Sequence, residues 1–374
     1  MEVVHIVRQY RPSVGGLEDA VQNLCTNLAH RDGIKVRVVT LDRLFTAPNK
    51  KLPRYEVLDG ISVTRLSYFG SSRYPIALQV LKEIRAASIV HVHAIDFFFD
   101  YLALTRFIHR KPLVASTHGG FFHTTFAALL KKIYFHTITR LSSCAYDVLC
   151  SSSENDSHTF RQIAPTKVVT IENGVNIAKW ENRGSLTPQR TMIFIGRWSA
   201  NKAIPVLIDL IAALKKIDAT WNLLIAGIPA QETQASLRAH AKKCGVSEHV
   251  QIFEGLSDAQ IGDLIGKASY VASASTYEGF GISIIEGLSA GLVPIMSPIP
   301  PFEKLRKLLG FGAVIDPSRI DACAREIENL HTRLTASTDP MREYCKALAR
   351  QYDWAKVTDS FVEIYRNVLK EGKS

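Results

Sequence analysis

Short apolar, β-branched runs alternate with longer amphipathic stretches along the whole chain. In the first half, the runs that predict strands are VVHIV (3–7), VRVVTL (36–41), SVTRL (62–66), IVHVH (89–93), LVAST (113–117), DVLCSS (147–152) and VVTIEN (168–173). In the second half they are TMIFIG (191–196), NLLIAG (222–227), VQIFEG (250–255), YVASAS (270–275), LVPIMS (292–297) and AVIDP (313–317). Helical patterns lie between several of these runs, for example over residues 17–30 and 76–87. This alternation predicts an α/β protein in which parallel sheets carry helices on both faces.

The length and composition indicate two domains. A chain of 374 residues that is 47% hydrophobic exceeds the usual size of a single core. A polar segment, WENRGSLTPQR (180–190), separates the two sets of strands and has the Gly, Ser and Pro typical of a linker. We therefore expect an N-terminal domain over residues 1–182, a C-terminal domain over 190–352 and a last helix over 353–374.

The net charge of +10 is concentrated in the N-terminal half. Residues 1–185 carry 23 Lys and Arg against 15 Asp and Glu, whereas the remainder carries 22 against 20. Such a basic half suits an anionic partner (phosphate, acidic lipid or nucleic acid), although a solubilising surface charge has the same composition. No run reaches the ~18 to 20 apolar residues of a spanning helix. The N-terminus does not resemble a signal peptide, and the six cysteines form no CxxC pair. These features are typical of a cytosolic protein, dissolved or bound to a membrane surface.

Two loops that follow predicted strands have the composition of phosphate-binding loops. After the first strand, Gly15 and Gly16 open a helix, where glycine lets a ligand approach the backbone and free N–H groups attract anions. This loop lacks the GxGxxG spacing of dinucleotide sites, and a glycine pair before a helix is more often a simple turn. The second loop, GRWSANKA (196–203), places Arg197 and Lys202 where two cations would either clamp a diphosphate or face solvent.

The stretch YEGFGISIIEGLSAG (277–291) combines two carboxylates with a glycine-rich turn. Glu278 lies in the turn after a strand, and Glu286 lies about a turn into the following helix. Paired carboxylates also serve glycosidases as acid and base, but that chemistry needs two groups on one bond. With cations and glycines close by, the pair favours hydrogen bonding to the hydroxyls of a sugar and a ribose. The alternative for Glu286 is a solvated position on the helix surface.

Together these motifs resemble retaining glycosyltransferase family 4. Its members have the GT-B architecture, in which two Rossmann-like doubly wound parallel-sheet domains face each other across a cleft. The resemblance covers essentially the whole chain and rests on the Gly15–Gly16 loop, IVHVH, STHGG (116–120), IENGVN (171–176), GRWSANK (196–202) and EGFG (278–281). It implies a last helix that crosses back to the first domain. One departure is Ala203, because the family usually has glycine after the loop lysine; we expect a slightly reshaped loop in an active enzyme.

The resemblance implies roles for individual residues. Gly16, beside Gly15, would donate its N–H to the donor diphosphate, and Arg197 and Lys202 would neutralise that leaving group. The other expected donor contacts are Glu278 and His118 at the sugar, Glu286 at the ribose, the amides of Gly279, Phe280 and Gly281, and the base-side loops around Gly227, Glu254 and Gly255. His118, Arg197, Lys202 and Glu278 form the expected catalytic set, and a structural role is the alternative for His118.

The resemblance is strongest to members that transfer α-mannose from GDP-mannose to cellobiose on a polyprenyl diphosphate, in exopolysaccharide assembly of the xanthan and acetan type. The motifs that indicate this are SSRYPIA (71–77), IDFFFDYLALT (95–105), STHGGFFHT (116–124), SSEND (152–156) and YDW (352–354). The resemblance implies front-face attack with retention, a donor phosphate oxygen as proton acceptor, and neither a metal nor another cofactor. Alternatives are UDP-glucose or UDP-GlcNAc as donor in lipopolysaccharide or glycolipid synthesis.

A lipid-linked acceptor implies work at the inner face of the cytoplasmic membrane. The segment FFHTTFAALLKKIYFHTITRL (121–141) shows an apolar helical face with basic residues beside it. This pattern is typical either of an interfacial helix on anionic lipid or of a helix packed on its own sheet. The candidates for acceptor or membrane contacts are Arg73, His118, Phe122, Phe126, Lys131 and Lys132, with Arg106, Arg110 and Lys111 as further head-group contacts.

Three other classes of protein compete with this interpretation. A dehydrogenase also uses doubly wound sheets, but it would carry the GxGxxG pattern that is absent here. A nucleic-acid-binding protein would explain the basic charge, yet the sequence contains no recognisable binding module, so we expect no nucleic-acid partner. A non-catalytic scaffold that binds a nucleotide sugar would have the same binding residues, and only an activity assay separates it from an enzyme.

Overall fold

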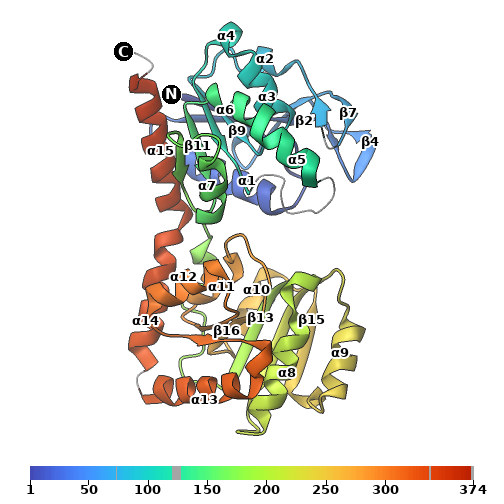
Figure 1. The fold of residues 1–374 in the computed structure, drawn as a ribbon, viewed down its shortest axis with the longest axis vertical. Coiled ribbons are helices and arrows are strands. Elements are labelled where there is room, and N and C mark those ends of the chain that lie inside the picture. Colours follow the sequence, from blue (N-terminus) through green and yellow to red (C-terminus); the bar gives the residue numbers. More distant parts are fainter. Residues whose placement is uncertain (73, 120–127, 337, 372–374) are drawn as a thin grey trace. The chain divides into compact units, whose positions relative to one another are not determined.

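The computed structural model describes residues 1–72, 74–119, 128–336 and 338–371. The chain divides into two compact units. Met1–Gly174 and Trp354–Ser374 form the N-terminal unit, and Val175–Asp353 forms the C-terminal unit. The first boundary therefore lies before the segment 180–190 that has the composition of a linker, and the last helix belongs to the N-terminal unit (Figure 1).

The N-terminal unit contains an eight-stranded sheet in the order β12-β11-β10-β9-β1-β2-β6-β5. Neighbouring strands are parallel except β5, which is antiparallel to β6. The strands are β1 (Glu2–Ile6), β2 (Lys35–Leu41), β5 (Tyr55–Leu58), β6 (Ile61–Leu66), β9 (Ile89–His93), β10 (Leu113–Ser116), β11 (Val148–Ser151) and β12 (Val168–Thr170). The seven strands predicted for this half are confirmed, most of them with slightly different ends. The antiparallel pairs β3 (Arg43–Leu44) with β4 (Ala47–Lys51) and β7 (Phe69–Ser71) with β8 (Tyr74–Ile76) were not predicted.

Helices cover both faces of this sheet because its strands send alternate side chains to opposite sides. Val4 and Ile6 pack under α3, whereas Val3 packs with α1 and α15 on the other face. In Figure 1, α15 lies along one edge of this unit, and it is in contact with α1. The helices are α1 (Gly16–Ala29), α2 (Val80–Glu83), α3 (Phe97–Leu104), α4 (Arg106–His109), α5 (Ala128–Tyr134), α6 (Arg140–Cys144), α7 (Glu154–Arg161) and α15 (Trp354–Glu371), with a π-helix (Phe135–Thr139) between α5 and α6.

The C-terminal unit contains a six-stranded sheet in the order β15-β14-β13-β16-β17-β18, with all neighbours parallel. Numbered within the unit, this is the order 3-2-1-4-5-6 of the Rossmann fold. The strands are β13 (Thr191–Trp198), β14 (Asn222–Pro229), β15 (Val250–Glu254), β16 (Tyr270–Ser273), β17 (Val293–Met296) and β18 (Ala313–Val314), which confirms the six predicted ones.

Two helical layers enclose this second sheet. Met192 and Phe194 of β13 pack against α8 on one face, and Ile193 and Ile195 pack in the opposite layer with α11. The helices are α8 (Ile204–Lys215), α9 (Gln234–Lys243), α10 (Asp258–Ile265), α11 (Ile282–Ser289), α12 (Pro300–Leu309), α13 (Ile320–Ala336) and α14 (Thr338–Ala349), with 3-10 turns at Ile177–Lys179, Ala200–Lys202, Ser247–His249, Pro317–Arg319 and Arg350–Tyr352. Among the described residues, no helix combines the length and the apolar character needed to cross a membrane.

Candidate active site

The C-terminal unit collects several of the predicted residues at the carboxyl edge of its sheet. The strand order reverses between β13 and β16, which is where doubly wound sheets bind ligands. Arg197 lies near the end of β13, and Lys202 ends the 3-10 turn that follows. Glu278 lies in the loop after β16. The end of β13 and the two loops that flank the reversal therefore carry three of the side chains predicted to bind the sugar and the diphosphate.

Lys202 and Glu278 form an ion pair. Lys202 Nζ lies 2.5 Å from Glu278 Oε1, and the two side chains are 20% and 12% exposed. Ser275 Oγ donates to the same oxygen at 2.7 Å. Two donors on Oε1 fix the orientation of the carboxylate, and Oε2 has no hydrogen-bond partner among the described residues. Arg197 is exposed and forms no ion pair within the described part of the chain.

The glycine turn before α11 has a shape that only glycine satisfies. Gly281 has φ 92°, and a Cβ at this position would lie 2.5 Å from the ring of Phe302. The side chain of Phe280 is buried against Tyr352, so any ligand contact by Phe280 belongs to its backbone. Gly279 is exposed, and a Cβ there would meet nothing within 4 Å. The turn thus has room for a ligand beside the start of α11.

Glu286 has a different partner from Glu278. It lies in α11 with its side chain 15% exposed, and Lys179 Nζ lies 3.8 Å from Glu286 Oε1. Lys179 also pairs with Asp258 at 2.8 Å. Burial raises the pKa of Glu286 to about 7, although the positive charge of Lys179 acts in the opposite direction. A solvated surface position is therefore the wrong interpretation of Glu286, because most of its side chain is buried.

The residues predicted near the nucleotide base lie together at the ends of β14 and β15. Gly227 and Glu254 are paired in the register of these strands, and Gly255 N–H donates to the Gly227 carbonyl at 3.0 Å. A Cβ on Gly227 would lie 1.8 Å from the Gly196 carbonyl oxygen, so this close approach to β13 requires glycine. The Glu254 side chain is exposed.

In the N-terminal unit, the predicted glycine pair lies where α1 begins. Gly15 is the N-cap residue and supplies no side-chain cap. A Cβ at Gly16 would meet nothing within 4 Å, whereas one at Gly15 would lie 2.5 Å from the Glu18 carboxylate. Free amides at the start of a helix attract anions, and Glu18 shows that a carboxylate fits beside this turn.

His118 lies in a loop that Asp156 holds in place. The loop follows β10, and His118 and Gly119 both have left-handed backbones, with φ of 49° and 78°. Asp156 Oδ2 accepts from Thr117 Oγ1 and, at 3.2 Å, from Gly119 N–H. Burial lowers the pKa of His118 to about 4, so its ring is neutral at physiological pH.

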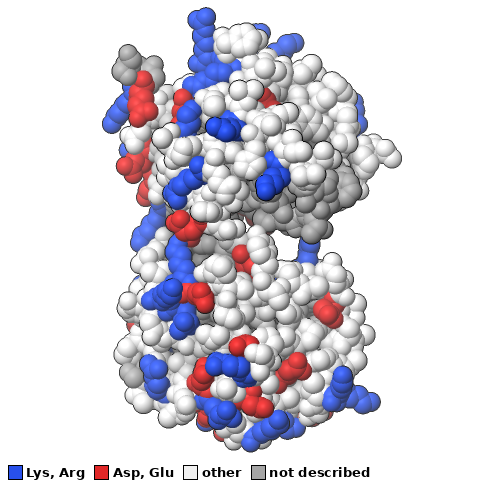
Figure 2. Space-filling view, viewed as in Figure 1, with Lys and Arg blue, Asp and Glu red and all other residues white. Residues whose placement is uncertain are grey.

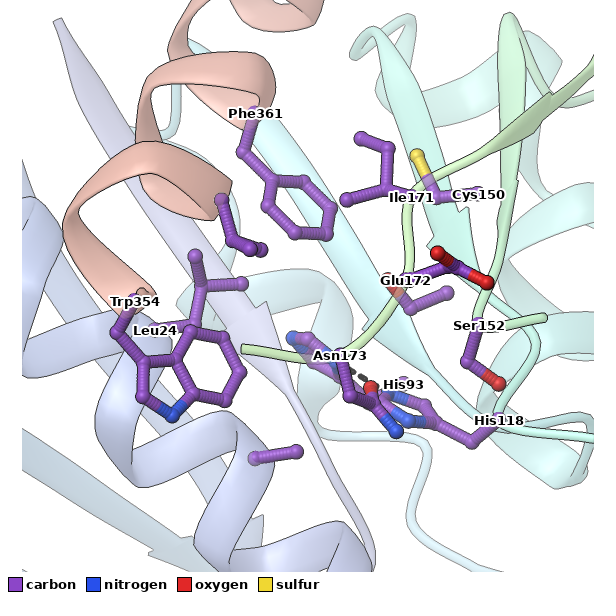
Figure 3. Close-up of a pocket in the computed structure, with 13 residues that line it drawn as sticks. Leu24, His93, His118, Cys150, Ser152, Ile171, Glu172, Asn173, Trp354 and Phe361 are labelled. Carbon is purple, nitrogen blue, oxygen red and sulfur yellow. Dashed lines mark hydrogen bonds between the residues drawn. The ribbon is translucent and has the colours of Figure 1, made fainter. Parts of the chain in front are cut away.

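A small cavity (≈ 20 Å³) borders the His118 ring, and His118 Nε2 lies 3.1 Å from His93 Nδ1. Figure 3 shows these two rings facing each other, with Ser152 and Asn173 beside them.

The residues predicted to contact acceptor or membrane are described only in part. Arg73, Phe122 and Phe126 lie outside the described residues. Lys131 and Lys132 lie in α5, half-buried and exposed respectively. The alternative of an apolar face packed on the sheet holds for Phe135 of the π-helix, which is buried against Phe160. It is wrong for the larger part of the face, because the following side chains are 47% to 76% exposed: Leu129, Leu130, Ile133, Ile138 and Leu141.

The residues that position the predicted ones were not themselves predicted from the sequence. Ser275 orients Glu278, Lys179 pairs with Glu286, and Asp156 holds the loop of His118. His93 contacts His118 directly. Asp156 and His93 stand in the motifs SSEND and IVHVH, but a motif alone does not state which side chain its residue will meet.

These parts define a class of protein. Two Rossmann-like units, one with a cation–carboxylate pair at its strand-order reversal, are the parts of a nucleotide-sugar-dependent glycosyltransferase of the GT-B type. The comparisons agree: the family described as Glycosyl transferases group 1 matches residues 178–351, and Glycosyltransferase Family 4 matches residues 14–179.

The relatives extend over nearly the whole chain. The GDP-mannose:cellobiosyl-diphosphopolyprenol alpha-mannosyltransferase of Komagataeibacter xylinus is 42% identical, covering 99% of this chain and 94% of the relative. The protein of the same name from Xanthomonas campestris is 42% identical over 99% and 97%. Anabaena HepE, solved in complex with UDP, has a TM-score of 0.73 at 17% identity, covering 98% of this chain and 100% of that chain. The chain belongs to glycosyltransferase family 4 and is a glycosyltransferase with the GT-B fold.

Proposed function

We propose that this glycosyltransferase moves mannose from GDP-mannose to cellobiose carried on a polyprenyl diphosphate, with retention of the α configuration, as a step of exopolysaccharide synthesis. The observation that carries the proposal is the 42% identity, over 99% of the chain, to relatives named for this donor and acceptor. The side chains at the carboxyl edge of the second sheet support it, because they suit an anionic donor that carries hydroxyl groups.

The donor would be held by charges that already pair with one another. The three N–H groups of Lys202 can serve Glu278 and a phosphate together, and exposed Arg197 adds a second cation for the leaving diphosphate. Glu278 Oε2 would accept a sugar hydroxyl, since Oε1 is taken by Lys202 and Ser275. Glu286 would accept the ribose hydroxyls, and the loops of Gly227 and Gly255 would border the base.

The reaction would then need orientation and charge stabilisation rather than a protein base. In front-face attack the acceptor hydroxyl arrives on the side from which the diphosphate leaves, and a phosphate oxygen takes its proton. Cations and helix N-termini stabilise the charge that develops on the leaving group. Glu278 is held by a cation, which favours a hydrogen-bond acceptor over a general acid. His118 is neutral and would position the sugar through one hydrogen bond.

The protein would bind its lipid-linked acceptor at an anionic bilayer, on the inner face of the cytoplasmic membrane. We define the apolar face as Leu129, Leu130, Ile133, Ile138 and Leu141 of the α5–α6 segment. A second exposed apolar group, Leu104, Phe107 and Ile108, lies around α4, and Arg106 of α4 donates to the Ala145 carbonyl just after α6. Exposed apolar side chains beside Lys132 and Arg140 suit the boundary between acyl chains and acidic head groups. Figure 2 shows Lys and Arg side chains at the α4 end of this unit, with few Asp or Glu among them.

The direct test is transfer of labelled mannose. Purified protein with GDP-[14C]mannose and a synthetic cellobiosyl-diphospholipid is expected to yield a labelled trisaccharide lipid, and α-mannosidase is expected to release the label. GDP-mannose is also expected to raise the melting temperature, because a ligand that binds the folded state at about 100 times its Kd contributes ~2.7 kcal/mol of stability.

Two results would contradict the proposal. If UDP-glucose or UDP-GlcNAc stabilises the protein and supports transfer but GDP-mannose does not, the enzyme uses that other donor. Donor binding without product on any lipid-linked acceptor would indicate a sugar-nucleotide-binding scaffold. The Lys202→Ala variant serves as a control for specific donor binding, because removing this cation is expected to abolish the thermal shift.

A further inference from the structure

Three histidines of the N-terminal unit form a continuous hydrogen-bonded row. His5 lies on β1, His93 on β9 and His118 after β10. His5 Nδ1 lies 2.9 Å from His93 Nε2, and His93 Nδ1 lies 3.1 Å from His118 Nε2. His5 and His93 face the layer of α1 and α15, and both are fully enclosed. We call His5, His93 and His118 the histidine row; Figure 3 shows its last link, from His93 to His118.

Each ring of the row carries one proton. Burial lowers the pKa of His5 to about 3 and that of His118 to about 4. Burial also lowers the pKa of His93 well below its usual value, and the neighbouring histidines add to this effect. Since a neutral imidazole has one N–H and one bare nitrogen, each ring can donate to only one neighbour. The row must therefore run in a single direction.

The unpartnered nitrogen of His5 decides the direction. His5 Nε2 is buried and has no hydrogen-bond partner in the described structure. If His118 donated to His93 and His93 to His5, this nitrogen would carry an N–H without an acceptor. If His5 donates to His93 and His93 to His118, it carries only a bare lone pair. Buried N–H groups without an acceptor are rarer than unsatisfied acceptors, which favours the second direction.

We propose that His5 and His93 are positioning residues that set the tautomer of His118, so that its Nδ1 carries the proton and offers an N–H to an oxygen of the donor. The part that concerns the donor rests on the proposed function. His118 Nε2 is occupied as an acceptor from His93, and Nδ1 has no hydrogen-bond partner among the described residues. Asp156 holds Thr117 and Gly119 on either side of His118, so the ring has a fixed direction.

A buried metal centre is the competing interpretation. The ring nitrogens of His5, His91 and His93 lie within 4.8 Å of one another. His91, however, already uses both nitrogens: Nδ1 lies 2.7 Å from Tyr365 Oη and Nε2 lies 2.9 Å from Ser116 Oγ. His93 likewise has both nitrogens in the row. A metal would have to break these bonds, so the hydrogen-bonded arrangement accounts better for the cluster.

The tautomers can be measured on the whole protein without any donor. Protein labelled with [15N]histidine gives long-range 1H–15N correlations that distinguish Nδ1–H from Nε2–H rings, and His118 is assigned from the spectrum of His118→Ala. The expected result for the wild type is Nδ1–H at His118. A wild-type spectrum with Nε2–H at His118 overturns the proposal, and this arm does not depend on any variant folding or on the mannose reaction.

A matched pair of variants tests the link from His5. The amide of His5→Asn lies near the place of the imidazole Nδ1 and can still donate to His93, whereas His5→Phe fills the space without a donor. The Phe variant is expected to shift His118 toward Nε2–H and to lower kcat about tenfold, the change that ~1.4 kcal/mol in the barrier produces. The Asn variant is expected to keep both the tautomer and kcat near the wild-type values.

A control variant separates positioning from stability. His91→Asn removes a buried histidine outside the row, so it is expected to lower the midpoint of urea unfolding without changing the His118 tautomer. If His5→Phe leaves the tautomer unchanged, or if Asn and Phe lower kcat equally, His5 has only a structural role and the proposal fails. If the Nδ1–H tautomer and its dependence on His5 are found but no mannose is transferred, the proposed function fails while the assignment of the row stands.

Discussion

At the residue scale, Glu278 and Glu286 belong to one short segment but lie in different electrostatic surroundings. Glu278 is bound by Lys202 and Ser275 on one oxygen. Glu286 is buried beside Lys179 at a longer distance, and its pKa is raised to about 7. An acid and a base that act on one bond would need to face the same atoms. Separate cationic partners favour two separate contacts to one donor molecule.

The Glu278→Gln variant tests the first contact. The amide keeps the size of the side chain but loses the charge that Lys202 binds. Its NH2 group cannot accept, so only one of the two partners, Lys202 or the sugar hydroxyl, keeps an acceptor. We expect kcat/KM for mannosyl transfer to fall by ~10²- to 10³-fold, as when a preorganised polar contact is removed from a transition state. The control is Glu248→Gln, an exposed position in the turn that leads into β15 and thus at the opposite edge of the sheet. Equal activity of the two variants would contradict a role for Glu278 in the donor site.

The raised pKa of Glu286 predicts pH-dependent donor binding. In the proposed donor site the carboxylate would accept from the ribose hydroxyls, whereas the protonated group is a poorer acceptor, so affinity should fall as the pH drops through about 7. For one proton at this pKa, the Kd of GDP-mannose should rise about tenfold between pH 8 and pH 6 by linkage. Isothermal titration calorimetry measures this dependence, and Glu286→Gln should make it flat.

The same ionisation affects folding in the opposite sense. Because the folded pKa of Glu286 lies above its ordinary value, the folded state binds more protons than the unfolded state between pH 4.5 and about 7. The contribution of Glu286 to stability is therefore present at low pH and is lost as the pH rises through about 7. If the Kd of GDP-mannose for the wild type does not change with pH, Glu286 does not contact the ribose.

How far the sequence predicts the site differs from residue to residue. Lys202 and Glu278 could be predicted because both follow strands, and adjacent parallel strands end at one edge of the sheet. Asp156 could not, because it meets Gly119 from a helix 37 positions away. The histidine row is equally hidden: His5 and His93 lie 88 positions apart and meet only through the order of the strands. Pairings of this kind depend on the topology rather than on local patterns.

At the scale of elements, the buried parallel strands could be predicted from apolar runs, whereas the mostly exposed antiparallel pairs could not. β4 (Ala47–Lys51) is mostly exposed and has the sequence APNKK, which has neither alternation nor β-branched residues. The α5–α6 segment carries a π-helix, and no periodicity in its sequence indicates one. The irregular segments that join the main helices and strands are thus less predictable from the sequence than the main elements themselves.

The junction between the loop after β13 and α8 contains a residue whose backbone conformation should lower the stability of the protein. Ala203 is the last residue before α8 and has a left-handed backbone, with φ 46° and ψ 43°. In this conformation a residue with a Cβ lowers the stability of the folded state by roughly 1 to 2 kcal/mol relative to glycine. Glycine in turn lowers the free energy of unfolding by about 0.4 to 1 kcal/mol, because it raises the entropy of the unfolded chain. Ala203→Gly should therefore raise the free energy of unfolding by roughly 0.5 kcal/mol.

Urea unfolding measures the Ala203 effect, with Ala200→Gly as the matched control. Ala200 begins the 3-10 turn that ends just before Ala203 and has no positive φ, so glycine there should destabilise the protein. The ion pair between Lys202 and Glu278 should be preserved in Ala203→Gly. The activity of this variant is therefore expected to stay at or above the wild-type value. A loss of stability in this variant would show that the left-handed position is not strained.

At the scale of the whole molecule, the N-terminal half combines the excess of positive charge with the exposed apolar face. Residues 1–185 carry 23 Lys and Arg against 15 Asp and Glu. Lys132 and Arg140 are exposed beside Leu129, Ile133 and Leu141. Basic charge draws a protein to an acidic bilayer over about a Debye length, and apolar side chains then hold it at the surface. Neither feature alone gives binding that is both selective for anionic lipid and resistant to salt.

Removal of the apolar face should therefore weaken membrane binding without harming the donor site. The triple variant Leu129→Ser, Ile133→Ser, Leu141→Ser is expected to bind phosphatidylglycerol vesicles at least about tenfold more weakly in co-sedimentation, since each side chain gives up apolar contact with the acyl boundary. Donor binding should be unchanged, while transfer to a vesicle-bound acceptor should fall with vesicle binding. The control replaces Leu186 and Ile217, exposed apolar residues of the C-terminal unit, by serine. Wild-type binding that is equal on anionic and neutral vesicles, or a triple variant that binds like the control, would show that this face meets a different partner.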